Sequence, residues 1–460
     1  MPLLIKNGEI ITADSRARAD IYCEGETITR IGAGLEAPAG TQVVDAAGKY
    51  VFPGFIDPHV HITLPFMGTF AKDTYETGSK AALAGGTTTL IEMCCPARSE
   101  DALAGFDHWM AQAAGRSACD FTFHMGATRF DGGTESGLRE IVRRGISSFK
   151  IFLAYKGAFG IDDSELYRIL KLARELGVVV TAHCENETLV AERQKELVGA
   201  GKTGPGQHHE SRPPVVEAEG VHHLMTFAEI TGAHTYIVHL SCERALDAAI
   251  SARRRGVRVT IETLIQYLVL DKTWAERPGF EGAKYVMSPP LRDASNQPVL
   301  WNGLRDGLIQ TVATDHAPFD FEGQKRMGES DFTKIPNGIP SLEERINLLY
   351  TCGVKAGRID LHTLVNVAST QVAKTFDLFP RKGAIQPGAD ADLVVFDPGY
   401  RGVISAKTQH MNVDYSAFEG WKIEGRPSVV TVRGHVAVRD GKFVGDPVRG
   451  RFLHRTPSRA

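Results

Sequence analysis

Two hydrophobic patterns divide the chain into a long central segment and two flanking segments. In the central segment, apolar runs typical of buried strands recur, and helical patterns lie between most of them. These runs lie at 51–57, 86–93, 120–126, 146–152, 177–183, 233–239, 256–262 and 308–315. Eight β/α units with strands that are apolar on both faces predict an α/β fold, a (β/α)8 barrel of the TIM type.

The clearest helical pattern lies over residues 164–176. Apolar side chains recur there on one face, Ser164 is the expected N-cap, and Gly177 follows the last turn. The segments after the fifth and eighth apolar runs are long, so we expect inserted loops or additional helices there.

Both ends of the chain show shorter strand patterns. Asn7-Gly8 lies between two apolar runs in residues 3–12 and predicts a hairpin, and Glu24-Gly25 repeats this pattern in residues 19–30. Near the other end, residues 391–397 and 428–444 form similar runs, the second with turns at Arg433-Gly434 and Asp440-Gly441. We therefore expect residues 1–50 and 382–460 to pack as one small β-sandwich domain, with the barrel at 51–381 inserted between them. Independent sheets at the two ends are the alternative.

Composition and charge narrow the functional classes. A hydrophobic fraction of 43% and a net charge of −3, from 52 basic and 55 acidic residues, fit a soluble globular protein and give no broad attraction to nucleic acid or anionic membranes. No apolar run is long enough to span a bilayer, and the first residues lack the features of a signal peptide. Seven cysteines without repeated spacing argue against a disulfide framework, so a reducing cytoplasm is the expected location.

Candidate metal ligands gather at the predicted C-terminal ends of the strands. They are His59 and His61 after the first run, Lys150 in the fourth, His183 after the fifth, His239 after the sixth and Asp315 after the eighth. In a (β/α)8 barrel these ends meet at one mouth. A single histidine at a strand end is more often a hydrogen-bonded structural residue. Five runs that each supply such a residue at the same relative position instead indicate a site for divalent metal.

Lys150 is the most informative member of this set. Phe149, Ile151 and Phe152 flank it, which favours a buried strand over a surface lysine. A buried ammonium carries a large desolvation penalty, so this amine should be neutral, paired or chemically modified. A neutral amine can react with carbon dioxide to form a carbamate, N6-carboxylysine. Such a group could bridge two metal ions, one bound by His59, His61 and Asp315 and the other by His183 and His239.

The ordered set Asp57-x-His59-x-His61, Lys150, His183, His239 and Asp315 resembles the amidohydrolase superfamily. Within it the chain is most similar to the hydantoinase and dihydropyrimidinase family of cyclic amidohydrolases, over nearly its whole length and including the split β-sandwich. The resemblance implies hydrolytic ring opening of cyclic amides and imides, from 5-substituted hydantoins to N-carbamoyl amino acids and also of dihydropyrimidines. It further implies two divalent ions per subunit, usually Zn²⁺ with Mn²⁺ or Co²⁺ possible, bridged by carboxylated Lys150 and a hydroxide, and a homotetramer.

The same resemblance implies roles for the residues around the metals. Asp315 would take the proton of the attacking hydroxide and pass it to the departing ring nitrogen. Tyr155 matches the family's hydroxyl donor to the developing oxyanion, although on position alone it is an ordinary loop aromatic. Ser288 and Asn337 match positions that hydrogen-bond the amide or imide edge of the substrate. From local sequence alone both are typical turn residues.

The loops around the expected mouth bear on the substrate. Dihydroorotases commonly carry an arginine two residues after the second histidine, whereas this chain has Thr63, which counts against an acidic ring. Apolar side chains in two of these loops predict a substrate lid with room for a hydrophobic ring substituent. They are Leu64, Phe66, Phe152 and Phe159. Packing of these side chains on one another or at a subunit contact is the alternative, and an allantoinase or a dihydroorotase-like enzyme stays possible.

Two other classes use a similar barrel. Mononuclear deaminases typically lack a lysine in the fourth run, so Lys150 disfavours them, and non-catalytic scaffold relatives have lost metal ligands that this chain retains. Of the remaining histidines, the pairs His208-His209 and His222-His223 are expected at the surface, and His316 is expected to point away from the barrel lumen.

Overall fold

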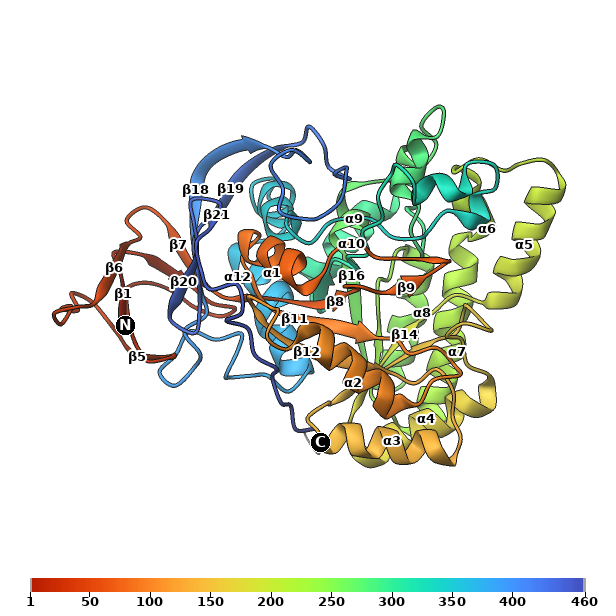
Figure 1. Ribbon diagram of the computed structural model, residues 1–460, viewed down its shortest axis with the longest axis horizontal. Coiled ribbons are helices and arrows are strands. Elements are labelled where there is room, and N and C mark those ends of the chain that lie inside the picture. The colour runs from red at the N-terminus through yellow and green to blue at the C-terminus, as the bar shows by residue number, and fades with distance from the viewer. Residues whose placement is uncertain (1, 458–460) are drawn as a thin grey trace.

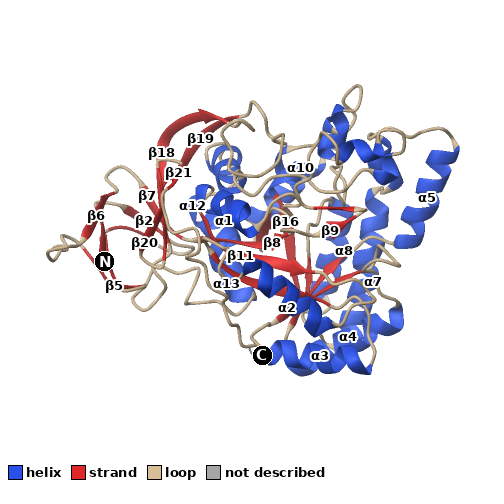
Figure 2. Cartoon of the chain, in the orientation of Figure 1, coloured by secondary structure: helices blue, strands red, loops and turns tan. Residues whose placement is uncertain are grey.

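The computed structural model describes residues 2–457 and consists of a barrel surrounded by helices and a β-sheet body beside it (Figure 1). The red strands from the start of the chain and the blue strands from its end lie next to each other in this body. Figure 2 shows the helices around the strands of the barrel.

The barrel has the strand order that the sequence predicts. Within residues 2–457 one sheet contains eight parallel strands in the order of the chain. They are β8 (Phe55–Val60), β11 (Thr87–Cys94), β12 (Asp120–Gly126), β13 (Ser148–Phe152), β14 (Val179–His183), β15 (Thr235–Ile237), β16 (Val259–Leu264) and β17 (Thr311–Ala313). A parallel bridge between Val60 and His316, with the His61 amide 2.8 Å from the His316 carbonyl oxygen, connects the last strand to the first. The predicted (β/α)8 barrel is confirmed.

Helices follow the barrel strands and cover their outer faces. The α-helices are α1 (Tyr75–Ala84), α2 (Ala102–Ala113), α3 (Gly132–Arg143), α4 (Asp163–Leu176), α5 (Glu187–Gly199), α6 (Gln207–Ser211), α7 (Pro214–Thr231), α8 (Glu243–Arg254), α9 (Ile265–Val269), α10 (Asn296–Arg305), α11 (Arg345–Leu348), α12 (Leu361–Val365) and α13 (Gln371–Thr375). Short 3-10 segments are η1 (Lys272–Trp274), η2 (Glu281–Tyr285), η3 (Lys325–Gly328) and η4 (Phe332–Lys334), and π-helical segments are η5 (Leu349–Val354) and η6 (Asn366–Thr370). As predicted, additional helices fill the long segments after β14 and β17.

The N-cap of helix α4 is Asp162, two residues before the expected cap. The carboxylate of Asp162 accepts a hydrogen bond from the Glu165 amide, and the Glu165 carboxylate accepts one from the Asp162 amide, which forms a reciprocal capping box. The prediction of Ser164 as N-cap was therefore wrong, because the stronger box lies upstream. Gly177 ends the helix in a left-handed conformation with φ of 72°, as predicted.

The described ends of the chain form two sheets. Within residues 2–457 the first sheet has four strands in the order β5-β4-β1-β6, and the second has seven in the order β21-β20-β19-β18-β7-β2-β3. The first sheet comprises β1 (Leu3–Lys6), β4 (Asp20–Glu24), β5 (Thr27–Gly32) and β6 (Gln42–Asp45). The second comprises β2 (Glu9–Ile11), β3 (Arg16–Arg18), β7 (Tyr50–Pro53), β18 (Leu393–Val403), β19 (Lys422–Val432), β20 (His435–Arg439) and β21 (Lys442–Phe443). The pairing of β7 with β18 joins the two ends of the chain in one sheet.

Apolar side chains of the two sheets share one buried cluster. Leu3 and Ile21 from the first sheet pack with Val51, Val395 and Val429 from the second. The first predicted apolar run is divided, because β7 belongs to this body and β8 to the barrel. The division into a sandwich domain of residues 1–50 with 382–460 and a barrel domain of residues 51–381 stays a proposal.

Asn7-Gly8 does not close a hairpin, so that prediction was wrong. Strands β1 and β2 belong to different sheets, and Asn7, with φ of 62°, donates its backbone N–H to the carboxylate of Asp20. The reason is tertiary, since β1 pairs with β4 and β2 pairs with β7, and these pairings bury both apolar runs. The turn at Glu24-Gly25 closes the hairpin β4–β5, as predicted.

Residues 450–455 return to the barrel from the second sheet. Phe452 forms a parallel bridge with Phe121, on the side of β12 that faces β13. Strands β12 and β13 pair only further along, at Met125 and Gly126. Arg455, which is 1% exposed, donates to Thr122 Oγ1 at 3.1 Å, to the Phe123 carbonyl and to Ser148 Oγ at 3.1 Å. These residues therefore fill the seam between β12 and β13.

A buried ion cluster connects the start of β12 to the sheet body. Lys382 Nζ lies 2.6 Å from an oxygen of Asp120, 2.6 Å from Asp392 and 3.0 Å from Asp390, and Arg433 also contacts Asp120. Burial alone would lower the pKa of Lys382, but the carboxylates of Asp120 and Asp392 outweigh this effect and raise it. In turn Lys382 and Arg433 outweigh the burial of Asp120 and lower its pKa.

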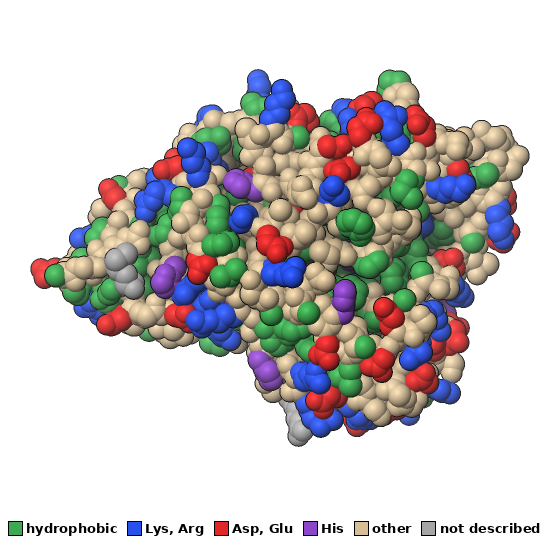
Figure 3. All heavy atoms as spheres, viewed as in Figure 1, with side chains coloured by type: hydrophobic (Ala, Val, Ile, Leu, Met, Phe, Trp, Pro, Cys, Tyr) green, Lys and Arg blue, Asp and Glu red, His purple; other side chains and the backbone are tan. Residues whose placement is uncertain are grey.

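The surface agrees with the composition. On the face in Figure 3, basic and acidic side chains are interspersed. No helix within residues 2–457 is long and apolar enough to cross a membrane. All seven cysteines lie in the described part of the chain and are free thiols, most of them buried.

Candidate metal and active site

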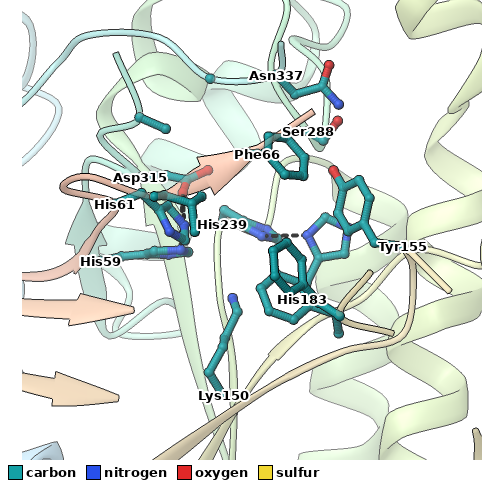
Figure 4. Close-up of a pocket in the computed structure, with 15 residues that line it drawn as sticks. His59, His61, Phe66, Lys150, Tyr155, His183, His239, Ser288, Asp315 and Asn337 are labelled. Carbon is teal, nitrogen blue, oxygen red and sulfur yellow. Dashed lines mark hydrogen bonds and ion pairs between the residues drawn. The ribbon is translucent and has the colours of Figure 1, made fainter. Parts of the chain in front are cut away.

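The C-terminal ends of the barrel strands surround one pocket, and the predicted site residues all line it (Figure 4). The lining includes the predicted metal ligands His59, His61, Lys150, His183, His239 and Asp315, the predicted substrate contacts Tyr155, Ser288 and Asn337, and the predicted lid residues Leu64, Phe66, Phe152 and Phe159. These residues come from segments spread over almost 280 residues of sequence, and the fold brings them together in one pocket.

The first group of predicted ligands consists of His59, His61 and Asp315. Both imidazole Nε2 atoms lie 3.1 Å from Asp315 Oδ1. One ligand atom from each of these three residues lies within 4.8 Å of the others, which suits a single divalent ion. Burial alone would raise the pKa of Asp315, but the neighbouring imidazoles of His59 and His61 outweigh it and lower the pKa.

The backbone at Asp315 determines which side chain faces the pocket. Asp315 adopts a left-handed conformation with φ of 47° just after β17. The next residue, His316, points away from the lumen as predicted, with Nε2 2.8 Å from an Asp73 oxygen. The carboxylate of Asp315 is thereby held toward His59 and His61.

The second group of predicted ligands is His183 with His239. Nδ1 of His183 lies 2.9 Å from Nε2 of His239, and Nε2 of His183 lies 2.9 Å from Glu185, which also pairs with Arg212 at 2.6 Å. The Arg212 charge and the His183 imidazole outweigh the burial of Glu185 and lower its pKa to about 2, so this carboxylate is ionised beside His183. A carboxylate on one ring nitrogen orients the imidazole and leaves the other nitrogen for a ligand.

Lys150 extends from β13 toward the space between the two groups (Figure 4). Its side chain is fully buried, and Nζ has no hydrogen-bond partner among residues 2–457. Nζ lies 4.7 Å from the centre of the Phe152 ring. Burial lowers the pKa of this amine, so the neutral form is less disfavoured than for an exposed lysine.

Glu262 contacts one residue of each group of predicted ligands, His59 and His239. Its Oε1 lies 2.9 Å from His59 Nδ1 and accepts the backbone N–H of His239 at 2.9 Å, while Tyr236 donates to Oε2 at 2.7 Å. Burial raises the pKa of Glu262 to about 8. When Nδ1 of His59 is the donor to Glu262, the imidazole has the tautomer that leaves Nε2 free to bind a metal.

Across the pocket, Tyr155 faces Ser288 and Asn337 (Figure 4). Tyr155 has a left-handed backbone with φ of 62°, and its N–H donates to Glu187 at 2.6 Å. Burial raises the pKa of the Tyr155 phenol, so the hydroxyl keeps its proton and can act as a donor.

Comparison with known proteins identifies the family. The model of the Amidohydrolase family matches residues 50–437. The chain belongs to this family. Among its relatives, the D-hydantoinase of Geobacillus stearothermophilus is 46% identical over 456 residues, which cover 99% of this chain and 97% of that protein. The dihydropyrimidinase of Rattus norvegicus is 36% identical over 99% of this chain and 89% of its own length. A solved D-hydantoinase (dihydropyrimidinase) from Thermus sp. superimposes with a TM-score of 0.98 and 65% identity, and the match covers 99% of each chain.

Membership of the amidohydrolase family implies a divalent metal centre, and the pocket fits one. Buried polar atoms in proteins are normally hydrogen-bonded. In the described part of the chain, two buried nitrogens next to the predicted ligand groups have no such partner. They are His59 Nε2 and Lys150 Nζ. Imidazole nitrogens and carboxylate oxygens are also the donor types that zinc and related ions prefer.

The predicted lid of this amidohydrolase packs on itself and on the pocket. Strands β9 (Pro65–Phe66) and β10 (Thr69–Phe70) form a small hairpin that carries Phe66. The Phe66 ring stacks on Phe159 with centroids 6.2 Å apart and contacts Tyr155 at 5.5 Å, and Phe152 lies 5.4 Å from Phe159. A separate groove of about 840 Å³ lies between the segments 65–69 and 155–159 and shares Phe66, Tyr155 and Phe159 with the lining of the pocket.

Some residues that shape the site of this amidohydrolase were not predicted. His208 was expected at the surface, but it is buried, with Nε2 2.8 Å from the Met287 carbonyl and 3.3 Å from Ser288 Oγ. That prediction was wrong because its polar neighbours in the sequence fold under the Ser288 segment. Glu262 ends the seventh apolar run, so an acidic residue inside a buried strand was the available signal for it.

Proposed function

We propose that this protein is a metal-dependent cyclic amidohydrolase that opens the rings of 5-substituted hydantoins, yielding N-carbamoyl amino acids, and of dihydropyrimidines. The observation that carries the proposal is the convergence of His59, His61, Asp315, His183 and His239 on one buried pocket. The full-length relatives named D-hydantoinase and dihydropyrimidinase support the same substrate class.

Two divalent ions, most commonly Zn²⁺ with Mn²⁺ or Co²⁺ as alternatives, are the proposed cofactors. His59, His61 and Asp315 would hold one, and His183 and His239 the other. Such ions polarise a carbonyl group and lower the pKa of water. Between them we propose Lys150 as N6-carboxylysine, in which the amine adds to carbon dioxide, forms a C–N bond and releases one proton. The lowered pKa and unpartnered Nζ of Lys150 support this modification.

The chain's own residues then move the protons of the reaction. Asp315, whose lowered pKa keeps it ionised, takes a proton from the attacking water as the new C–O bond forms. The same carboxyl group returns that proton to the ring nitrogen as the C–N bond breaks. Tyr155 donates its hydroxyl to the oxyanion that develops on the attacked carbonyl. Ser288 and Asn337 hydrogen-bond the amide edge of the ring.

The lid residues select the substituent on the ring. The aromatic rings of Phe66, Phe152 and Phe159 form an apolar wall, and the adjoining groove leaves space for a bulky group. At the position where dihydroorotases commonly have an arginine, Thr63 offers no positive charge for a carboxylate. A hydrophobic substituent is therefore favoured over an acidic ring. A homotetramer in the cytoplasm completes the proposal, and light scattering of the purified protein tests the oligomeric state.

A ring-opening panel tests this function. The metal-loaded protein is compared on 5-substituted hydantoins of both hands, dihydrouracil, allantoin and dihydroorotate, with metal-stripped protein as the control. We expect the highest kcat/KM for hydantoins with bulky apolar substituents. Preference for dihydroorotate or allantoin would overturn the substrate assignment, and no turnover of any ring with metals bound would overturn the function itself.

A further inference from the structure

A buried lysine lies outside the metal site and close to the substrate side of the pocket. Lys325 is the first residue of η3, and its side chain is fully buried. Its Nζ donates to three backbone carbonyl oxygens, those of Val286 at 2.9 Å, Pro336 at 2.6 Å and Gly338 at 2.7 Å. The distances to Val286 and Gly338 are ordinary for hydrogen bonds, and the distance to Pro336 is slightly shorter.

The number of donors on Lys325 matches the number of acceptors around it. An ammonium has three N–H donors and no acceptor, so it satisfies all three carbonyls, whereas a neutral amine would leave one of them facing a lone pair. Burial lowers the pKa of Lys325 well below its ordinary value, and the three carbonyl dipoles oppose this effect. Despite this cost in free energy, one Nζ atom holds all three carbonyl groups close together.

The three carbonyls belong to the two segments that carry Ser288 and Asn337. Pro336 and Gly338 flank Asn337 on both sides, and Val286 lies two residues before Ser288. The Val286 carbonyl also accepts the Gly338 N–H at 3.0 Å, so the segments contact each other directly next to Lys325.

Each segment is also anchored separately to a different part of the barrel. The Ser288 segment is held by His208, through the Met287 carbonyl, and by Tyr267, which donates to the Pro289 carbonyl at 2.6 Å. The residue after Gly338, Ile339, bridges to His316 beside β17. Lys325 is thus the side chain that joins these two anchored segments.

Gly338 shows how closely the second segment is packed. It adopts φ of 143°, and a Cβ at this position would lie 2.5 Å from the Ala317 carbonyl oxygen. An L side chain does not fit this conformation or this space. The Asn337 segment is therefore fixed against Ala317, and Lys325 holds the Val286 carbonyl of the Ser288 segment beside it.

We propose that Lys325 is a positioning residue that sets the distance between Ser288 and Asn337 and thereby determines how tightly the amide edge of the ring is bound. This inference rests on the proposed function, in which both residues contact that edge. Lys325 itself touches no substrate. It acts through backbone carbonyls, and displacements of about 1 Å at such contacts are enough to cost on the order of 100-fold in rate.

The test is a double-mutant cycle in the metal-loaded enzyme with one 5-substituted hydantoin as substrate. Lys325→Met removes the donors while keeping an unbranched side chain of similar length, and Ser288→Ala removes the hydroxyl. We expect Lys325→Met to raise KM by on the order of 10- to 100-fold with a smaller change in kcat and an unchanged metal content. In the Lys325→Met background, Ser288→Ala should cost less than it does in the wild type, because the hydroxyl is already misplaced.

The control is Lys334→Met in the same loop, since the Lys334 side chain is 68% exposed and pairs only loosely with Asp331 at 3.6 Å. This variant should keep the wild-type KM. Should Lys325→Met not accumulate as folded protein, Lys325→Gln, which keeps two N–H donors, carries the same cycle and should show an intermediate KM.

The outcomes separate the inference from the proposed function. A wild-type enzyme that opens no ring overturns the function. If the wild type is active and Ser288→Ala raises KM, an unchanged KM in the Lys325 variants overturns the inference alone. Strictly additive effects in the cycle would also overturn it, because a lysine that only stabilises the fold would not couple to the Ser288 hydroxyl.

Discussion

Replacing Lys150 with methionine should change stability in opposite directions with and without metal. In the metal-free protein, Lys150 Nζ is buried and has no hydrogen-bond partner within residues 2–457. An unsatisfied buried polar group costs about 1–3 kcal/mol. With an unfolding entropy of about 2.1 cal/mol/K per residue over 460 residues, this corresponds to a Tm change of about 1–3 °C. Metal-free Lys150→Met should therefore melt about 1–3 °C above the metal-free wild type.

With metal added, the wild type should have a higher Tm than Lys150→Met. A ligand at 100 times its Kd stabilises the native state by about 2.7 kcal/mol, so two ions would raise the wild-type Tm by about 5 °C. Lys150→Met has no amine to form a bridging carbamate, so its Tm should rise much less when metal is added. The assay is thermal unfolding followed by circular dichroism, in chelator and in added Zn²⁺, together with metal atoms per chain measured by elemental analysis.

Lys171→Met is the matched control, because Lys171 is exposed on α4 and should change stability by less than about 0.5 kcal/mol in either condition. The reasoning about Lys150 is refuted if metal-free Lys150→Met is less stable than the metal-free wild type. Retention of two ions per chain and full activity by this variant would refute the bridging role.

Three further predictions concern the pocket and the ion cluster. Glu262→Gln should weaken metal affinity about 10- to 100-fold in a chelator competition, because Glu262 contacts His59 and the backbone of His239. The control, Glu243→Gln at an exposed position, should bind metal like the wild type. Equal metal affinities of Glu262→Gln and the wild type would contradict the proposed orienting role. Phe159→Ala should raise KM for aryl-substituted hydantoins but not for dihydrouracil, and a parallel rise for both would exclude a substituent wall. Lys382→Met should lower the free energy of unfolding by about 3–5 kcal/mol at pH 7, because it removes the ammonium that the buried carboxylates of Asp120 and Asp392 share and leaves Asp120 with Arg433 alone. The pKa of Asp120 is lower in the folded than in the unfolded protein, so its ion pair stabilises the fold above about pH 4, and this stabilisation is lost as the pH falls through the folded pKa. The difference in unfolding free energy between wild type and Lys382→Met, measured by urea titration, should therefore shrink in acid. A difference that does not depend on pH would contradict this origin.

The barrel was predictable because its signal is long and repeated. Each buried strand, such as β11 or β14, is a run rich in apolar and β-branched residues that is buried along its whole length, and this pattern does not depend on distant partners. The convergence of the proposed metal ligands on one pocket was predictable for a related reason. His183 directly ends its strand, His239 lies two residues past β15, and the fold places all C-terminal strand ends at one mouth.

Residues whose role depends on a distant partner were harder to predict. Asn7-Gly8 has the local chemistry of a hairpin, but pairings with strands far along the chain decide the register. Lys325 lies in a polar stretch, and only the folded chain shows that its amine meets three carbonyls. Likewise, nothing near His208 in the sequence indicates that Met287 and Ser288 will cover it.

The contact of residues 450–455 with the barrel has a consequence for biosynthesis. Arg455 and Phe452 complete the seam between β12 and β13, although these strands are made more than 300 residues earlier. A ribosome must therefore release nearly the whole chain before that part of the barrel wall can close. Until then the edge of β12 at Phe121 lacks its pairing with residues 451–453, and an unpaired strand edge of this kind favours aggregation. A shortened chain that ends before residue 450 would keep every proposed metal ligand and still leave this seam open.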